Sequence, residues 1–331
     1  MIRAVVTGLG IYVPERILSN QDLERMMDTN DEWIVSRTGI RERRLAHENE
    51  ATSDMAVEAS QAALKDAGVK AEEIDFIVVA TNTPDTVFPS TAARLQARIS
   101  DTPIPGVDVQ AGCTGWIYGI SMASAMIQAG QYRRVLVVAS DKLSSITDYE
   151  DRSTAVLFGD GAGAIVLEAS ATSPYGILST YLNADGRGAD LLALPAGGSR
   201  WPASKDTVES RLHFLKMSGN DVFRFAVKAM PDAVEEGLKR AGLTVQDMDM
   251  LVPHQANQRI IDAAMRQFGL SEDKVVKNIE RYGNTSVASI PLALDEVRQD
   301  GRLKAGSVLV LAAFGAGLTW GSTVIRWGDE V

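Results

Sequence analysis

The sequence has very little cysteine and no long apolar run. Cys113 is the only cysteine in 331 residues, which excludes an internal disulfide and a cysteine-rich metal site and agrees with a reducing compartment. No segment approaches the roughly 20 apolar residues that cross a bilayer. The first apolar run is interrupted by Gly8 and Gly10, so it predicts a strand and a turn and not a signal peptide. We therefore expect a cytoplasmic protein without membrane contact.

Basic residues are scarce relative to acidic ones. The chain has 33 Lys and Arg against 43 Asp and Glu, a net charge of -10, which opposes non-specific binding to nucleic acid. An acidic partner would therefore need a local basic patch. With 45% hydrophobic and 23% charged residues, the composition predicts one large or two medium globular domains and gives no indication of disorder.

The single cysteine lies in an unusual setting. Residues 106–130 predict a short buried strand, a tight turn at Gly112, and a helix that begins near Thr114 and has almost no polar face. Cys113 then stands at a helix N-terminus, where free N–H groups and the helix dipole stabilise an anion and lower a thiol pKa. This position favours a reactive thiolate, although an inert buried cysteine is the more common case on position alone.

Helical and strand patterns alternate along the first half of the chain. The pattern predicts a helix capped by Asn20 and another that ends at Gly68. Two polar segments, 31–44 and 151–154, are expected to be loops. Strands are expected at 2–8, 74–80, 135–140 and 162–168, and helices at 20–27, 56–67 and 90–99. This alternation predicts a mostly parallel sheet covered by helices.

The second half of the sequence repeats the first. Residues 63–78 align with 237–252, and 135–139 align with 308–312, at offsets of 174 and 173. A period this long indicates duplicated domains and not a solenoid, and we place the halves at 1–172 and 173–331. The same offset carries Cys113 onto Ser286, so polar residues of both halves are expected to meet near a pseudo-twofold axis.

Seven motifs carry a family resemblance. They are GLGIYVPE, DEWIVSRTGIRERR, AGCTGWIYG, DRSTAVLFGDGAGA, VPHQANQRI, YGNTSVASIP and FGAGLTWGS. In this order they resemble the 3-oxoacyl-[acyl-carrier-protein] synthases III of the thiolase superfamily, which start fatty acid synthesis. The resemblance covers essentially the whole chain. It implies an α/β fold, a duplicated five-layered αβαβα sandwich, and a homodimer.

The resemblance also implies a catalytic set. Cys113 would take an acyl group from acyl-CoA as a thioester. His254 and Asn284 would donate hydrogen bonds to the thioester oxygen while malonyl-acyl carrier protein loses its carboxylate. The backbone N–H groups of Cys113 and Ala316 would form a second oxyanion hole, and Ala316 stands where many members have glycine. Without the resemblance, a structural histidine and a turn asparagine are the more common interpretations.

Binding residues for coenzyme A follow from the same motifs. Trp33, Arg37 and Arg152 match the residues that hold the nucleotide, with an aromatic ring for adenine and guanidinium groups for phosphate. Asn220 and Ala256 match contacts to the pantetheine arm. From the residues alone, the arginine-rich segment is as consistent with a solvated loop.

The acyl pocket and the carrier-protein surface are the remaining implied sites. Phe88 matches a residue that shapes the acyl pocket across the dimer, and its bulk favours short donors such as acetyl-CoA. Arg259 matches the family's main contact to acyl carrier protein. Arg224 and Arg266 would extend this patch. Segment 254–268 predicts a helix that starts at His254, and in it Arg266 lies two turns after Arg259. Three unrelated surface arginines are the alternative.

The implied reaction joins acyl-CoA to malonyl-acyl carrier protein and releases CO2 and coenzyme A. It needs no cofactor and no metal, and the glycine-rich segments 8–10 and 159–163 lack the strand–helix context of nucleotide loops. A thiolase would need a second cysteine. The alternatives that stay open are the same triad acting on another acyl donor in secondary metabolism, a cysteine hydrolase, and an inactive scaffold, which would be expected to have lost a triad residue.

Overall fold

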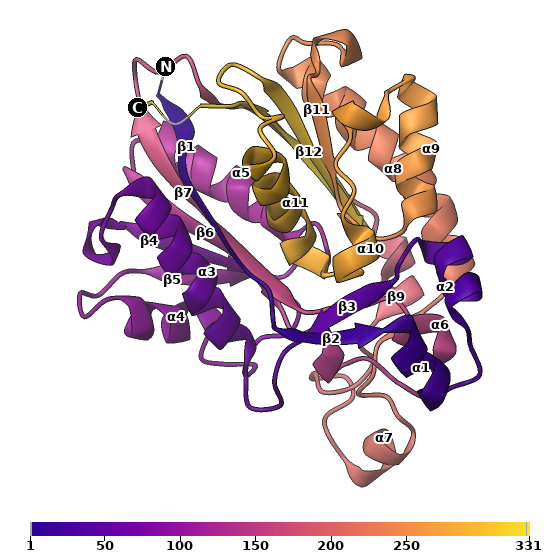
Figure 1. Cartoon of the computed structure of the whole chain (residues 1–331). Coiled ribbons are helices and arrows are strands. Elements are labelled where there is room, and N and C mark those ends of the chain that lie inside the picture. The colour runs from indigo at the N-terminus through magenta and orange to yellow at the C-terminus, as the bar shows by residue number, and fades with distance from the viewer. Residues whose placement is uncertain (1, 329) are drawn as a thin grey trace.

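Two β-sheets form the frame of the molecule (Figure 1). The computed structural model describes residues 2–328, 330 and 331. In that part of the chain the first sheet runs in the order β1 (Arg3–Tyr12), β7 (Gly161–Ser170), β6 (Arg134–Asp141), β4 (Phe76–Ala80), β5 (Gly106–Val109). The second runs in the order β11 (Met250–Pro253), β12 (Val308–Gly315), β13 (Thr319–Arg326), β8 (Gly176–Ala184).

Helices cover both faces of each sheet. Figure 1 shows α5 (Gly115–Gln128) and α11 (Ser289–Gln299) between the two sheets. The outer face of the first sheet carries α3 (Thr52–Ala67) and α4 (Thr91–Ile99), and that of the second carries α8 (Gly219–Arg240) and α9 (Gln258–Phe268). Three clusters of buried apolar side chains follow these layers. The predicted αβαβα sandwich is therefore confirmed.

The sequence explains how the helices pack. α5 is apolar on nearly every side, and its residues Trp116, Ile117 and Ile120 are buried between the sheets. α3 is amphipathic and lies directly on β1. A Cβ atom at Gly10 of β1 would lie 2.2 Å from the Ala63 nitrogen of α3, so this close approach requires glycine. α3 ends, as predicted, at a left-handed Gly68.

The two sheets repeat one another in strand order and direction. β1–β7 and β7–β6 are antiparallel and β6–β4 is parallel. β8–β13 and β13–β12 are likewise antiparallel, and β12–β11 is parallel. At the place in the second sheet that corresponds to β5, β11 pairs through a single bridge between Leu251 and Val275. This repeat agrees with the predicted duplication, while the boundary at residues 172 and 173 stays a prediction.

The expectation of a mostly parallel sheet is wrong. Each sheet is mixed because β7 and β13 run antiparallel to the strands β6 and β12 that precede them. The connection to β13 is the tight segment 316–318, and the connection to β7 is the longer segment 142–160. An antiparallel return of this kind needs no crossover helix, whereas a parallel one does. The sequence pattern of a buried strand is apolar in either direction, so it could not distinguish the two arrangements.

Two segments predicted as loops contain regular structure. Residues 31–44 hold α2 (Asp31–Thr38) and β3 (Glu42–Leu45), and β3 pairs with β2 (Arg16–Ser19). The arginine residues indicated a solvent-exposed segment, but Arg43 in β3 points inward and is fully buried. Residues 151–154 fall mostly within α6 (Arg152–Ala155), a single turn capped by the Asp151 side chain.

Three predicted helix starts also differ. α3 begins at Thr52 and not at residue 56. The cap of α1 (Asn20–Met26) is Ser19 and not Asn20, because the Ser19 hydroxyl accepts from Asp22 N–H while the Asp22 carboxylate accepts from Ser19 N–H. α9 begins at Gln258, with Asn257 as its cap, and not at His254. His254 therefore lies in the loop between β11 and α9.

The remaining elements belong to connections. β9 (Leu192–Ala193), α7 (Lys205–Glu209) and β10 (Lys216–Met217) lie between β8 and α8. α10 (Ile279–Tyr282) precedes a 3-10 turn at Ser286–Ala288 that leads into α11. None of the helices in the described part of the chain combines the length and the apolar character that a membrane crossing requires.

Candidate active site

Cys113 lies where the two halves of the molecule touch. It follows Gly112, which ends the turn after β5 with a φ of 56°, and it precedes α5. A Cβ atom at Gly112 would lie 2.5 Å from the Ala316 nitrogen, and one at Gly315 would lie 2.4 Å from the Cys113 nitrogen. The backbone segments that carry Cys113 and Ala316 are therefore in direct contact, and this contact depends on glycine at both positions.

Ala316 needs no unusual backbone. The non-glycine residues with positive φ in the described chain are Arg211 and Ser286. An alanine at position 316 is thus compatible with its own backbone conformation. The Ala316 nitrogen lies against Gly112, the residue before Cys113.

The Cys113 thiol is free and partly buried, and the hydroxyl of Ser286 donates a hydrogen bond to its sulfur at 3.5 Å. Burial raises the pKa of Cys113 to about 12, the Ser286 hydrogen bond lowers it, and the negative charge of Asp141 raises it. The expectation of a lowered thiol pKa is wrong for this free state. The helix start is a local feature of the sequence, whereas burial of the thiol depends on the tertiary packing around it.

His254 is buried at the end of β11, with 1% of its surface exposed. Burial lowers its pKa to about 3, so the ring is neutral at physiological pH. Its Nδ1 lies 2.6 Å from Ser289 Oγ, and that oxygen accepts a hydrogen bond from Gln255 N–H at 3.4 Å. In the tautomer that carries its proton on Nε2, Nδ1 accepts the Ser289 hydroxyl proton. His254 is then a hydrogen-bond donor.

Asn284 is held by both its backbone and its side chain. Its N–H donates to Leu157 O at 2.8 Å, and its carbonyl accepts from Gly159 N–H at 3.0 Å. Its side-chain Oδ1 accepts from Ser286 N–H at 2.9 Å. The carbonyl end of the carboxamide is thereby occupied, so the N–H groups of the carboxamide remain for a ligand.

One short segment connects the three proposed catalytic residues. Segment 284–289 contains Asn284, donates to Cys113 through Ser286, and contacts His254 through Ser289. The sequence motifs indicated Asn284 but did not indicate either serine. The signal for Ser286 was present, since the repeat aligns it with Cys113. Neither the spacing nor the composition indicated Ser289.

The proposed coenzyme A residues form a cluster at the surface. The guanidinium carbon of Arg152 lies 4.6 Å from the centre of the Trp33 ring, and that of Arg37 lies 5.2 Å from it. The carbonyl of Arg37 accepts a hydrogen bond from the Asn257 side chain at 3.0 Å, so α2 lies against the start of α9. The aromatic ring and two cations thus gather from motifs that are far apart in sequence.

The three comparisons with known proteins agree. Models for 3-oxoacyl-[acyl-carrier-protein] synthase III and for its C-terminal part match residues 107–186 and 238–327. Beta-ketoacyl-[acyl-carrier-protein] synthase III of Caldanaerobacter subterraneus subsp. tengcongensis is 53% identical over 326 residues, 98% of each chain. The chain belongs to the beta-ketoacyl-[acyl-carrier-protein] synthase III family. It is therefore an acyltransferase of the condensing type.

Solved structures of this synthase III family have the same fold. The beta-ketoacyl-[acyl-carrier-protein] synthase III of Thermus thermophilus is 47% identical, with a TM-score of 0.91 over 98% of this chain and 100% of that one. The priming β-ketosynthase of the R1128 polyketide pathway is 37% identical, with the same TM-score over 99% and 97% of the two chains. Synthase III enzymes and a priming ketosynthase thus share this architecture.

The two residues predicted to contact the pantetheine arm both lie in the second half of the chain. Asn220 is exposed in the first turn of α8, and Ala256 is half-buried in the loop between β11 and α9.

Among the described residues, no three His, Cys, Asp or Glu side chains are grouped as metal ligands would be.

A basic hollow lies between α8 and α9. Arg259 and Arg266 both line it, together with Phe223 and Asp262, and the Arg259 guanidinium carbon lies 5.1 Å from the centre of the Phe223 ring. Arg224 does not line this hollow, and its guanidinium forms an ion pair with Asp221 on the same helix. The structure therefore groups two of the three arginines that were assigned to the carrier-protein surface.

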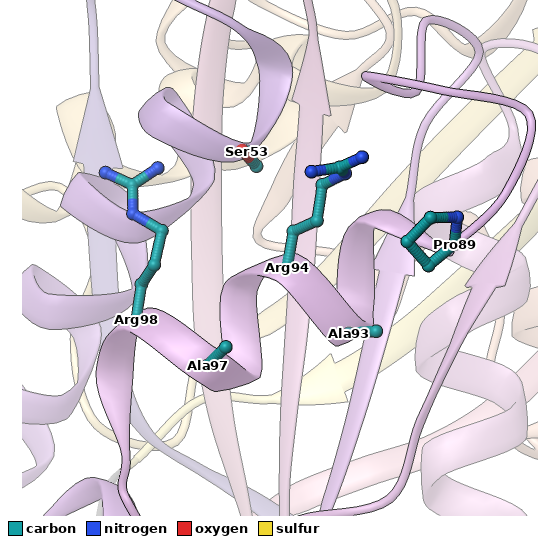
Figure 2. A pocket seen from close by; sticks show the side chains of 6 residues that line it. All are labelled: Ser53, Pro89, Ala93, Arg94, Ala97 and Arg98. Atoms are coloured by element: carbon teal, nitrogen blue, oxygen red, sulfur yellow. The ribbon is translucent and has the colours of Figure 1, made fainter.

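Phe88 is 83% exposed in this single chain. It adjoins a second hollow, which Figure 2 shows over α4, with Arg94 and Arg98 pointing from the helix toward Ser53. Both arginines already pair with carboxylates, Arg94 with Asp85 and Arg98 with Asp54. The exposure of Phe88 is compatible with the predicted contribution across a dimer, which stays a prediction.

Proposed function

We propose that this member of the synthase III family initiates fatty acid synthesis by condensing an acyl-CoA, with acetyl-CoA as the preferred donor, with malonyl-acyl carrier protein. The products are 3-oxoacyl-acyl carrier protein, CO2 and coenzyme A. Family membership and the convergence of Cys113, His254 and Asn284 on segment 284–289 carry this proposal. No cofactor takes part, since acyl-CoA is a substrate.

In the first step, the Cys113 sulfur attacks the thioester carbonyl of acyl-CoA. The bond between the acyl carbon and the coenzyme A sulfur breaks, and the proton lost by Cys113 ends on coenzyme A as its thiol. The backbone N–H groups of Cys113 and Ala316 donate to the carbonyl oxygen while it carries negative charge. Their side-by-side placement across the contact of the two halves supports this role.

In the second step, the malonyl group loses CO2 and leaves an enolate on the thioester. His254 Nε2–H and Asn284 Nδ2–H donate to the enolate oxygen, so neither residue has to remove a proton. The enolate carbon then attacks acyl-Cys113 and releases the Cys113 thiolate, which takes up a proton from solvent. A neutral histidine and an asparagine whose carbonyl end is occupied suit such a pair of donors.

Substrate binding is divided between two surfaces in this proposal. The cluster of Trp33, Arg37 and Arg152 binds the nucleotide of coenzyme A, and Asn220 and Ala256 contact its pantetheine arm. This arrangement is supported by the gathering of the two guanidinium groups on the Trp33 ring.

The basic hollow of Arg259 and Arg266 would receive the acidic acyl carrier protein. Arg224, outside the hollow, would contribute less. The protein would work in the cytoplasm, because a lone catalytic thiol requires a reducing compartment. It would work as a homodimer, with Phe88 of each protomer shaping the acyl pocket of the other.

A second acyl donor is the rival function. The priming β-ketosynthase of a polyketide pathway is 37% identical to this chain, so the same triad could serve another donor. Initial rates with acetyl-CoA, longer straight acyl-CoAs and branched acyl-CoAs, each with malonyl-acyl carrier protein, distinguish the two. We expect the highest kcat/KM with acetyl-CoA and release of one CO2 per product. A preference for a long or aromatic donor would instead establish the rival.

A further inference from the structure

A serine of the second half lies beside the Cys113 sulfur. Ser286 is 3% exposed, and its Oγ lies 3.5 Å from Cys113 Sγ. Its φ of 52° lies in the left-handed region, which a residue with a side chain adopts only at a cost. The surrounding structure therefore holds Ser286 in a strained conformation that brings its hydroxyl to the thiol.

Two further residues orient this hydroxyl. Asn82 Nδ2 donates to Ser286 Oγ at 3.1 Å and to Asp141 Oδ2 at 2.9 Å. Asp141 is fully buried at the end of β6, and its other oxygen accepts from Asn82 N–H at 2.6 Å and from the Thr81 and Thr83 hydroxyls. This buried carboxylate fixes the Asn82 carboxamide with its NH2 group toward Ser286. Because the Ser286 oxygen then accepts from Asn82, its own proton is directed at the sulfur.

We propose that Ser286 is a hydrogen-bond donor to the Cys113 thiolate, and that Asn82 and Asp141 are the residues that position it. This inference rests on the proposed role of Cys113 as the nucleophile. The donor acts twice. It stabilises the sulfur as it loses its proton and bonds to the acyl carbon, and again when the condensation breaks that bond and releases the thiolate.

The surroundings of the thiol explain why such a donor is needed. The charged group that acts on the sulfur is the Asp141 carboxylate, from β6, and its negative charge opposes a thiolate. His254, which follows β11, is neutral because burial lowers its pKa to about 3. Among the side chains that influence the pKa of Cys113, Ser286 is the one that lowers it. A neutral hydroxyl therefore takes the place that a cation occupies beside many reactive thiols.

The test reads the thiol directly. The rate of Cys113 alkylation by iodoacetamide, measured without substrate between pH 7 and pH 10, should fall by about tenfold at each pH in Ser286→Gly, as expected for losing one hydrogen bond to a charged group. Glycine accepts a φ of 52°, so this variant removes the hydroxyl without adding strain. Ser286→Ala should show the same loss.

Matched controls separate the hydroxyl from packing. Ser60→Ala removes another buried serine hydroxyl, in α3, whose oxygen has no hydrogen-bond partner, and it should leave alkylation unchanged. Asn82→Ala should slow alkylation less than Ser286→Gly, and the double variant should be no slower than Ser286→Gly alone. Thermal unfolding of each variant checks that it is folded.

Two results would overturn the proposal. One is alkylation of folded Ser286→Gly at the wild-type rate. The other is slowing in Ser286→Ala but not in Ser286→Gly, which would assign the effect to backbone strain. Alkylation needs neither acyl-CoA nor carrier protein, so these results are independent of whether the proposed condensation is the true reaction.

Discussion

The two halves of the molecule have the same strand order and present different chemistry at equivalent places. In the first half, the turn at Gly112 leads through Cys113 directly into α5. In the second half, the position aligned with Cys113 is Ser286, and a 3-10 turn follows it before α11 begins. A thiol and a hydroxyl thus stand at two like helix starts, within hydrogen-bonding distance of each other.

Because of this difference, the two halves have different proposed roles in the reaction. The first half supplies the proposed nucleophile and the cluster of Trp33, Arg37 and Arg152. The second half supplies hydrogen-bond donors, with His254 and Asn284 each held so that an N–H group remains for the ligand. In the proposed mechanism, the side chains at these two equivalent places assign attack to one half and stabilisation of the enolate to the other.

Removing the Cys113 thiol should have the largest effect on activity. Cys113→Ala deletes the group that forms the covalent intermediate, so condensation should fall to background. Incubation with acetyl-CoA followed by intact-mass measurement should show one added acetyl group in the wild type and none in the variant. Acetylation that persists in Cys113→Ala would place the nucleophile elsewhere.

Removing donors from the second half should separate the two steps. His254→Ala and Asn284→Ala should each slow decarboxylation of malonyl-acyl carrier protein by ~10²-fold or more, the usual loss for one oxyanion donor. Both variants should retain much of the acetylation of Cys113, since that step draws on other donors. Release of labelled CO2 and acyl-enzyme mass report the steps separately. Loss of acetylation with decarboxylation intact would contradict the division.

Reversing one charge in each half should affect the use of the two substrates differently. Arg259→Glu should raise KM for malonyl-acyl carrier protein by on the order of tenfold at low salt, less at high salt, because screening weakens charge contacts. Acetyl transfer from coenzyme A should stay near wild type. Arg37→Glu should give the opposite pattern. Arg224→Glu should have a smaller effect than Arg259→Glu, since Arg224 already pairs with Asp221. Equal loss of both activities in Arg259→Glu would indicate a structural role.

The smallest expected effect is on stability and concerns the buried ring of the second half. The pKa of His254 is lowered to about 3 in the folded protein and is about 6.5 in an unfolded chain. The unfolded state therefore binds more protons below pH 6.5, and the fold loses stability as the pH falls. Between pH 7.5 and pH 5 this group should cost about 2 kcal/mol of unfolding free energy. Urea unfolding of wild type and His254→Ala should show this extra pH dependence only in the wild type.

Local patterns predicted much of the fold. The end of α3 at Gly68, the start of α5 after Cys113 and the order of the two halves all follow from residues that are close in sequence. The segment 31–44 was misjudged because Arg43 is buried through distant partners: its guanidinium donates to the carbonyls of Leu18 and Val156. No neighbour in sequence signals that burial.

The candidate site also depends on contacts between residues that are distant in sequence, which local patterns do not predict. The motifs indicated Cys113, His254 and Asn284, and the repeat aligned Ser286 with Cys113. The protonation of the site could not be predicted, because desolvation of the thiol and of the imidazole depends on burial in the folded protein. The contact of Ser289 with His254 likewise joins positions 35 residues apart.

The glycines at 112 and 315 have a consequence for how the enzyme tolerates mutation. One methyl group at either position would overlap a backbone nitrogen of the opposite half. Alanine is among the substitutions that a single base change in a glycine codon produces. A random mutational survey should therefore find, at these two codons, alleles that lose turnover. Such alleles would show that the short distance between these two backbone segments is itself under selection.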